Sequence, residues 1–246
     1  DPKYQKAMQR DSKPQSNTAH GVNTKPSPSA DSKPAAPPSS SQLPETPAEA
    51  PKMIAFPANI EKDWSKLWDD TYAAHDKAQN ADMQNTPPLK ETGYTVERRM
   101  FSGELANTQV GGVASDSDWF QAGWYPDPGY RTTGVFHLHD YPTKSRSGSV
   151  DGADAASMVQ RGDAFIVARS GTAKDGVNEY MFVRTAATKD LPANSQDETD
   201  ATKIKLLAKG VPFDQATRQA ALDFAKNHDL VYYEGSNGKF KRVYPP

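Results

Sequence analysis

The chain has 246 residues, enough for one good-sized domain or for a domain with a tail. A formal net charge of -2 argues against a nucleic-acid surface, and the absence of cysteine excludes disulfides, thiolate metal sites and cysteine nucleophiles. No apolar run approaches the roughly 18 residues of a membrane-spanning helix, so we expect no membrane insertion. No signal peptide opens the chain, and its start at Asp1 rather than at Met indicates a fragment or a processed piece.

Residues 1–52 are rich in Pro, Ser, Ala, Lys and Gln, as in the run KPSPSA at 25–30. Apolar side chains there are few and aperiodic, so the segment cannot bury enough surface to offset its ordering entropy. We predict a disordered Pro/Ser/Ala-rich linker over 1–52 and one domain over 53–246. A proline-rich ligand for a partner is the less favoured interpretation of this segment.

The composition changes after residue 52, and regular elements follow. Ile60, Trp64 and Trp68 recur at helical spacing, which predicts a helix from an N-cap at Asn59 to about Gln79. Strands are predicted at 93–101, 134–139, 164–168, 180–184, 230–233 and 239–244. Helices are predicted at 151–160, with Gly162 as the stop, and from a cap at Asp214, while 186–203 are expected to form a polar loop. This order favours a single mixed-sheet α/β domain with flanking helices.

His137 and His139 are the main candidates for a functional site. In a strand, residues i and i+2 point to the same face, so both imidazoles can reach one point in space. Imidazole nitrogen is a preferred zinc ligand. An H-x-H pattern taken alone favours a structural or accidental pair, so a metal site requires further ligands.

Asp154 is the best candidate for a third ligand, because it follows a Ser/Gly-rich loop and lies in the first turn of the helix predicted at 151–160. Asp151 and Asp154 also occupy the N-cap and N3 positions, where carboxylates stabilise a helix end without any metal. Capping and ligation are compatible, since a capped helix end holds a carboxylate at a fixed place.

A catalytic zinc requires three protein ligands, an open position and a nearby carboxylate that moves protons. Glu91, which enters the strand predicted at 93–101, is the candidate for this carboxylate. Considered alone, Glu91 fits an ordinary solvated carboxylate at a strand edge. Glu97 and Glu104 are the fallback bases if the register of the strand differs.

Together these residues resemble a known family. The pattern is similar to that of the JAB/JAMM (MPN) zinc metalloproteases. It consists of a glutamate shortly before a glycine at a strand start, then an H-x-H strand, then a Ser-x-x-Asp-like element that opens a helix. The resemblance covers roughly Trp64 to Val183. Within this family, the sequence is more closely similar to the JAB-like domains at the C-termini of bacterial Rhs and other polymorphic toxins. The segments that carry this similarity are ETGY (91–94), GVFHLHD (134–140) and GDAFIV (162–167).

The resemblance implies a cytidine-deaminase-like α/β core and one Zn²⁺ held by His137, His139 and Asp154, with Glu91 as the proton-transferring residue. It implies hydrolysis of a peptide or isopeptide bond in a protein or peptide substrate. It also implies a secreted or delivered bacterial toxin or effector module, with an immunity or carrier protein as a further partner.

One position departs from the family pattern. The serine expected three residues before the ligand aspartate is Asp151 here, and an ionised aspartate cannot donate a hydrogen bond to an oxyanion. Ser149 is the candidate replacement as a catalytic residue, with Ser147 close by. Otherwise Asp151 only caps the helix, or the activity is weakened.

Two other functions stay open. The same domain with a silent metal site would act as a protein-binding module, through the sheet or through residues 145–154. The second alternative is a metal-dependent hydrolase that cleaves a bond other than a peptide bond. A deaminase is disfavoured, because the paired cysteine ligands usual in that class cannot exist here.

Overall fold

The computed structural model describes residues 33–73, 91–110, 126, 128–139, 148–172 and 176–246. The compact unit Lys33–Pro246 is built on an eight-stranded sheet in the order β1-β8-β7-β6-β5-β4-β2-β3. The strands are β1 (Met53–Ala55), β2 (Gly93–Arg99), β3 (Leu105–Val110), β4 (Tyr130–Leu138), β5 (Phe165–Thr172), β6 (Gly176–Val183), β7 (Val231–Ser236) and β8 (Lys239–Tyr244). β4 and β5 pair in parallel, and the other neighbours pair antiparallel.

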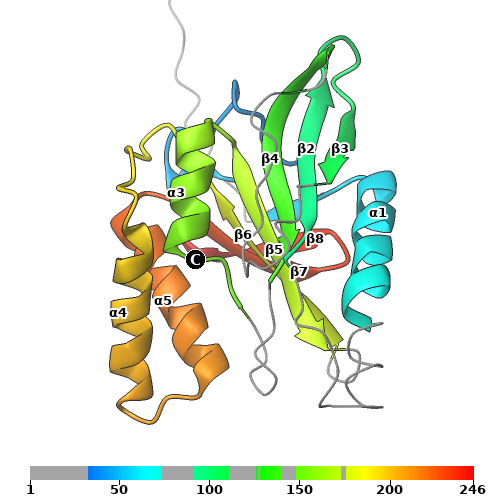
Figure 1. Cartoon of the computed structure of the whole chain (residues 1–246). Coiled ribbons are helices and arrows are strands. Elements are labelled where there is room, and N and C mark those ends of the chain that lie inside the picture. Colours follow the sequence, from blue (N-terminus) through cyan, green and yellow to red (C-terminus); the bar gives the residue numbers. More distant parts are fainter. Residues whose placement is uncertain (1–32, 74–90, 111–125, 127, 140–147, 173–175) are drawn as a thin grey trace, which may run out of the picture. The chain divides into compact units, whose positions relative to one another are not determined.

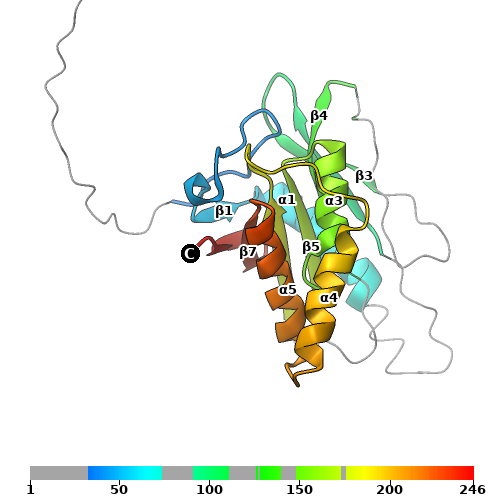
Figure 2. The same cartoon turned by 90° about the vertical axis from the view of Figure 1, so that its left-hand side faces the viewer.

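Helices cover both faces of this sheet. Figure 1 shows α1 on one side and α3, α4 and α5 on the other, and Figure 2 shows α3, α4 and α5 in front of the strands. The helices are α1 (Ala58–Trp68), α3 (Gly152–Arg161), α4 (Ser195–Leu207) and α5 (Phe213–Asn227), with a short 3-10 helix at Pro47–Glu49 and a π-helical turn at Asp69–Ala73. The chain therefore forms the mixed α/β domain with flanking helices that the sequence predicts.

Successive side chains of the central strands point to opposite faces of the sheet, where they form two apolar layers. On β4, Phe136 faces α1, where it stacks on Trp64 with ring centroids 4.2 Å apart. Val135 packs in the opposite layer, which includes Met158 of α3 and residues of α5. Because successive strand residues alternate between faces, His137 shares the face of Val135 and is directed toward α3.

Residues 33–52 make specific contacts with the domain. Ala35 pairs with β1, since its N–H donates to Met53 O and its carbonyl accepts from Ala55 N, each at 2.9 Å. Ala50 is buried, and Arg242 of β8 donates to Ala48 O at 2.9 Å. These contacts place 33–52 within the compact unit, upstream of the boundary expected at residue 53. Residues 1–32 of the expected linker lie outside the described residues.

The strands predicted from 93–101 onward correspond to β2, β4, β5, β6 and the β7–β8 hairpin. The helix starts differ: Pro57 and Pro212 are the N-caps of α1 and α5, where Asn59 and Asp214 were expected. Proline suits a helix start, because its φ is preset and its missing N–H needs no partner there. The helix end predicted near Gln79 lies outside the described residues.

The prediction of a polar loop over 186–203 is wrong in its second half, because α4 begins at Ser195. The buried residues of α4 are Ser195 and Thr199, so the helix has no apolar stripe that the sequence would reveal. β1 was also unexpected. It lies at one edge of the sheet, where β8 and Ala35 supply its backbone partners.

Candidate metal centre

The two central histidines lie where β4 ends. Leu138 N donates to Thr92 O at 2.8 Å, and His139 N donates to Arg169 O at 2.9 Å, so strands on both sides fix this backbone. The imidazole rings of His137 and His139 have centroids 4.7 Å apart. The structure therefore brings the pair together on one face, as the i and i+2 spacing predicts.

Two glycines allow a close approach to these histidines. A Cβ on Gly93 would lie 2.1 Å from Phe136 O and 2.7 Å from His137 Cα. A Cβ on Gly148 would lie 2.3 Å from His139 Nδ1. A larger residue at either position would displace the histidine beside it.

Asp151 and Asp154 cap α3 reciprocally. Asp151 Oδ1 accepts hydrogen bonds from Ala153 N at 2.9 Å and from Asp154 N at 3.1 Å. Asp154 Oδ2 accepts in turn from Asp151 N at 3.1 Å. This capping box holds the Asp154 carboxylate in place at the start of the helix. Gly162 ends α3 with a φ of 74°, as predicted.

The Asp154 carboxylate contacts both histidines. Its Oδ1 lies 3.1 Å from His137 Nε2, and its Oδ2 lies 3.2 Å from His139 Nε2. One ligand atom from each of the three residues lies within 4.8 Å of the other two. Tetrahedral ligands about 2.1 Å from an ion are about 3.4 Å apart, so the donor separations suit such an ion. This buried triad of two imidazoles and one carboxylate can hold a metal ion.

The charges of the triad depend on one another. Burial opposes ionisation of Asp154, but His137 and His139 hold the pKa of its carboxyl well below the usual range. Burial lowers the pKa of His139, but the carboxylates of Asp154, Glu91 and Asp151 together outweigh burial and raise that pKa to about 9. Burial and the Asp154 charge together raise the pKa of Asp151. Asp154 therefore stays anionic at neutral pH and stabilises a positive charge between the histidines.

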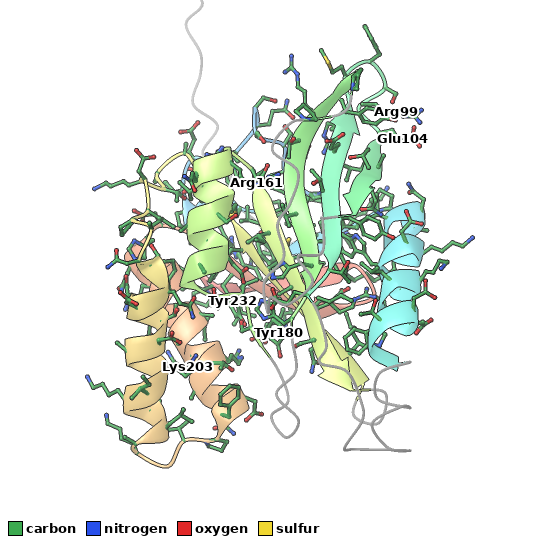
Figure 3. All side chains as sticks on the ribbon, in the orientation of Figure 1. Arg99, Glu104, Arg161, Tyr180, Lys203 and Tyr232 are labelled. Atoms are coloured by element: carbon green, nitrogen blue, oxygen red, sulfur yellow. The ribbon has the colours of Figure 1, made fainter. Side chains whose placement is uncertain are left out.

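Glu91 lies beside the triad. β2 and β4 pair Gly93 with His137, so the antiparallel register sets Glu91 opposite His139. The half-buried Glu91 carboxylate contributes to the raised pKa of His139. The fallback residues lie elsewhere: Glu97 is buried further along β2, and Glu104 is exposed beside Arg99 at the outer end of the β2–β3 hairpin (Figure 3).

Ser149 is buried, and its Oγ lies 2.9 Å from the Tyr232 hydroxyl. With His139 and Asp151 it lines a pocket of about 100 Å³, whose other wall is formed by α4 and α5. Lys203 of α4 is one of the lining residues (Figure 3). The remaining lining residues are Gly148, Val150, Gln196, Thr199, Phe213, Thr217, Ala220 and Ala221.

Sequence reasoning did not include Gly93, Gly148 or Tyr232 in the site. The two glycines had a signal, since each lies within two residues of a candidate site residue, where only a missing side chain allows close approach. Tyr232 had none, because it is far from Ser149 in the sequence and reaches it only through the fold. Ser147 lies outside the described residues.

Comparison of the chain with models of protein families, with curated proteins and with solved structures finds no match. Within the ranges that the structure describes, no helix combines the length and apolar character needed to cross a membrane. The assignment of a function therefore depends on the residues of the metal centre and on the elements that hold them.

Proposed function

We propose that this domain binds one zinc ion and hydrolyses a peptide or isopeptide bond. The observation that carries the proposal is the buried triad of His137, His139 and Asp154, whose ligand atoms lie within 4.8 Å of one another. Two imidazoles and one carboxylate are a ligand set typical of catalytic zinc, which keeps a fourth position open. The position of Glu91 opposite His139 supports a hydrolytic role.

The order of elements around the triad also supports a JAB/JAMM-like domain. Along the chain come α1, then β2 preceded by Glu91, then β4 with the H-x-H pair, then α3 with Asp154, then the buried strand β5. This is the order on which the resemblance of residues 64–183 depends. A cytidine-deaminase-like core is part of the proposal.

Each residue has a separate part in the proposed reaction. Zinc, when bound, supplies a Lewis acid that lowers the pKa of a coordinated water toward about 7. Glu91 takes a proton on its carboxylate and returns it to the leaving amine. Asp154, fixed by the cap of α3, keeps its charge directed at the histidines. Ser149 can donate a hydrogen bond to an oxyanion when its Oγ accepts a hydrogen bond from Tyr232.

The proposal includes a protein or peptide substrate and delivery as a secreted bacterial toxin or effector module, with an immunity or carrier protein as a partner. The similarity of residues 91–94, 134–140 and 162–167 to toxin-borne JAB-like domains supports this part. The pocket of about 100 Å³ beside His139 has room for one small side chain, since it equals the volume of about three waters.

Metal content and turnover of matched variants test the proposal. Elemental analysis should find about one zinc per chain, and His137→Ala/His139→Ala should lose it. Cleavage of a peptide library, read by mass spectrometry, should fall at least about 100-fold in Glu91→Gln, which should keep its zinc. Glu104→Gln, an exposed glutamate of the neighbouring hairpin, serves as the control and should keep both. Full activity of Glu91→Gln, or no zinc after reconstitution, would contradict the proposal.

A silent metal site in a protein-binding module is the second candidate function. Asp151 stands where the family has an oxyanion-stabilising serine, and its carboxylate accepts two backbone N–H groups of α3. The Ser149 hydroxyl is engaged with Tyr232. Stoichiometric zinc in a wild-type chain that cleaves no peptide would favour this candidate over the hydrolase.

A further inference from the structure

A second pocket lies between the outer end of the β2–β4 pair and residues 39–42. Its volume is about 500 Å³, and the lining residues include Arg98, Arg99 and Arg131. Among the described residues, none that lines it is acidic; the other lining residues are Ser39, Ser40, Ser41, Gln42, Met100, Gly103, Thr132 and Thr133. The pocket is thus basic and rich in hydroxyl groups.

Arg98 and Arg131 are direct cross-strand partners in the β2–β4 ladder. Side chains directly opposite each other on antiparallel strands share one face, with Cβ atoms about 5 Å apart, and like charges there are destabilising. In the described part of the chain no carboxylate pairs with either arginine, whereas Arg99 next to them has Glu104 at 3.6 Å. Within the described ranges, the protein therefore supplies no negative charge that offsets the pair.

The guanidinium of Arg98 is held by backbone carbonyls. One terminal nitrogen donates to Gly103 O at 2.7 Å and the other to Pro37 O at 3.2 Å. Its Nε is buried and has no hydrogen-bond partner among the described residues. A fixed, partly buried guanidinium is a preorganised group for binding an anion.

Residues 37–42 close one side of the pocket. Pro37 is buried and accepts from Arg98, and Ser40 Oγ donates to Thr132 O at 3.3 Å. These bonds fix the segment against β4, so that Ser39 and Ser41 add hydroxyl groups near the arginines. The N-terminal segment therefore contributes polar groups to a built site.

We propose that this pocket binds a small molecule carrying phosphoryl groups. Phosphate oxygens accept several hydrogen bonds at once and match the planar donor fork of arginine. The volume of about 500 Å³ lies in the range of small-molecule sites and exceeds the need of a single phosphate group. Arg131 lies about 20 Å from His137 along β4 at the usual rise per residue, so this site is separate from the metal centre.

Titration calorimetry with pyrophosphate tests the proposal on the full chain, kept in chelator so that no metal contributes. The wild-type chain should bind about one pyrophosphate, and Arg131→Gln should weaken binding about 10-fold or more, because one charged donor fork is lost. Arg131 is exposed, so this variant should fold normally. Arg98→Gln should weaken binding at least as much. Lys226→Gln removes the same charge from an exposed position on α5 and should change nothing.

Absence of pyrophosphate binding by the wild-type chain would overturn the proposal. Equal weakening by Lys226→Gln and Arg131→Gln would also overturn it, since that pattern reflects only overall charge. Citrate is the second probe: binding as tight as that of pyrophosphate would show a general anion site and contradict the phosphoryl assignment. When pyrophosphate is added, the largest NMR chemical-shift changes should be those of Thr132 and Ser40.

Discussion

His139 carries a proton beside the Asp154 carboxylate in the metal-free protein at neutral pH, because its pKa is raised to about 9. A histidine that binds zinc must be a neutral imidazole, so binding of the proposed zinc ion would displace this proton. The anionic Asp154 serves both states, first as the partner of a protonated histidine and then as a ligand. At the scale of single residues, the proposed metal ion and the proton would therefore compete for the imidazole of His139.

This competition predicts how stability depends on pH without metal. A folded-state pKa near 9 against an ordinary value of 6.5 gives stability that is fully present below pH 6.5 and lost as the pH rises through about 9. Denaturant unfolding in chelator should show a loss on the order of 2 kcal/mol across this range. In Asp154→Asn the imidazole resonance of His139 should titrate at a lower pH, and the loss should shrink. An unchanged titration in this variant would contradict the role of Asp154.

At the scale of elements, α3 joins two tasks at its first turn, since Asp151 caps the helix and Asp154 reaches the histidines. Asp151→Ser keeps an N-cap acceptor and, for the proposed JAB/JAMM-like peptidase, adds the hydroxyl expected at this position. We expect the unfolding free energy to change by less than about 1 kcal/mol and peptide cleavage to rise.

Asp151→Ala provides the comparison, since it removes the cap without adding a donor. It should cost about 1 kcal/mol in denaturant unfolding and should not raise cleavage. If the serine and alanine variants cleave peptides equally, position 151 has no part in stabilising an oxyanion.

Elements with a strong local pattern could be predicted from the sequence. β5 begins with the apolar run Phe165–Ala168, α3 has both of its caps, and the β7–β8 turn has Asn237 and Gly238 with positive φ. α4 could not be recognised, because Ile204 and Leu207 are exposed while its buried residues are Ser195 and Thr199. Short edge strands such as β1 depend on pairing with a distant strand, which local sequence does not encode.

The candidate site also contains residues that the sequence could predict and residues that it could not. His137, His139, Asp154 and Glu91 are recognisable because the ligands lie close in sequence and the glutamate precedes a neighbouring strand. The pocket wall formed by Phe213 and other residues of α4 and α5 is not recognisable, because it depends on how these helices pack.

At the scale of the whole domain, a buried ion network on the α1 face of the sheet joins α1 to the central strands. Arg169 of β5 donates to Glu61 of α1 at 2.9 Å and, through Nε, to Glu179 of β6 at 2.9 Å. Glu179 also accepts from Gly238 N in the β7–β8 turn at 2.8 Å. The carbonyl of Arg169 accepts from His139 N, which connects the network to the metal centre.

Arg169→Met should therefore destabilise the domain by about 3 to 5 kcal/mol, because it leaves the buried Glu179 charge without its partner. Arg218→Met is the matched control, since it breaks the exposed pair with Glu234 and should cost less than about 1 kcal/mol. Denaturant midpoints of both variants measure the difference. Similar midpoints would show that the Arg169 network adds no more than a surface pair.

β4 and β5 are the one parallel pair among the named strands, and α3 lies between them in the chain. All three ligands come from this unit, and His139 is separated from Asp154 by only about 15 residues. The entropy of closing so short a loop is small, so an ion can be captured while the rest of the chain is still unfolded. The proposed zinc ion would then act as a folding template for this segment, and its affinity for the unfolded chain would offset part of the stabilisation that it gives to the finished domain.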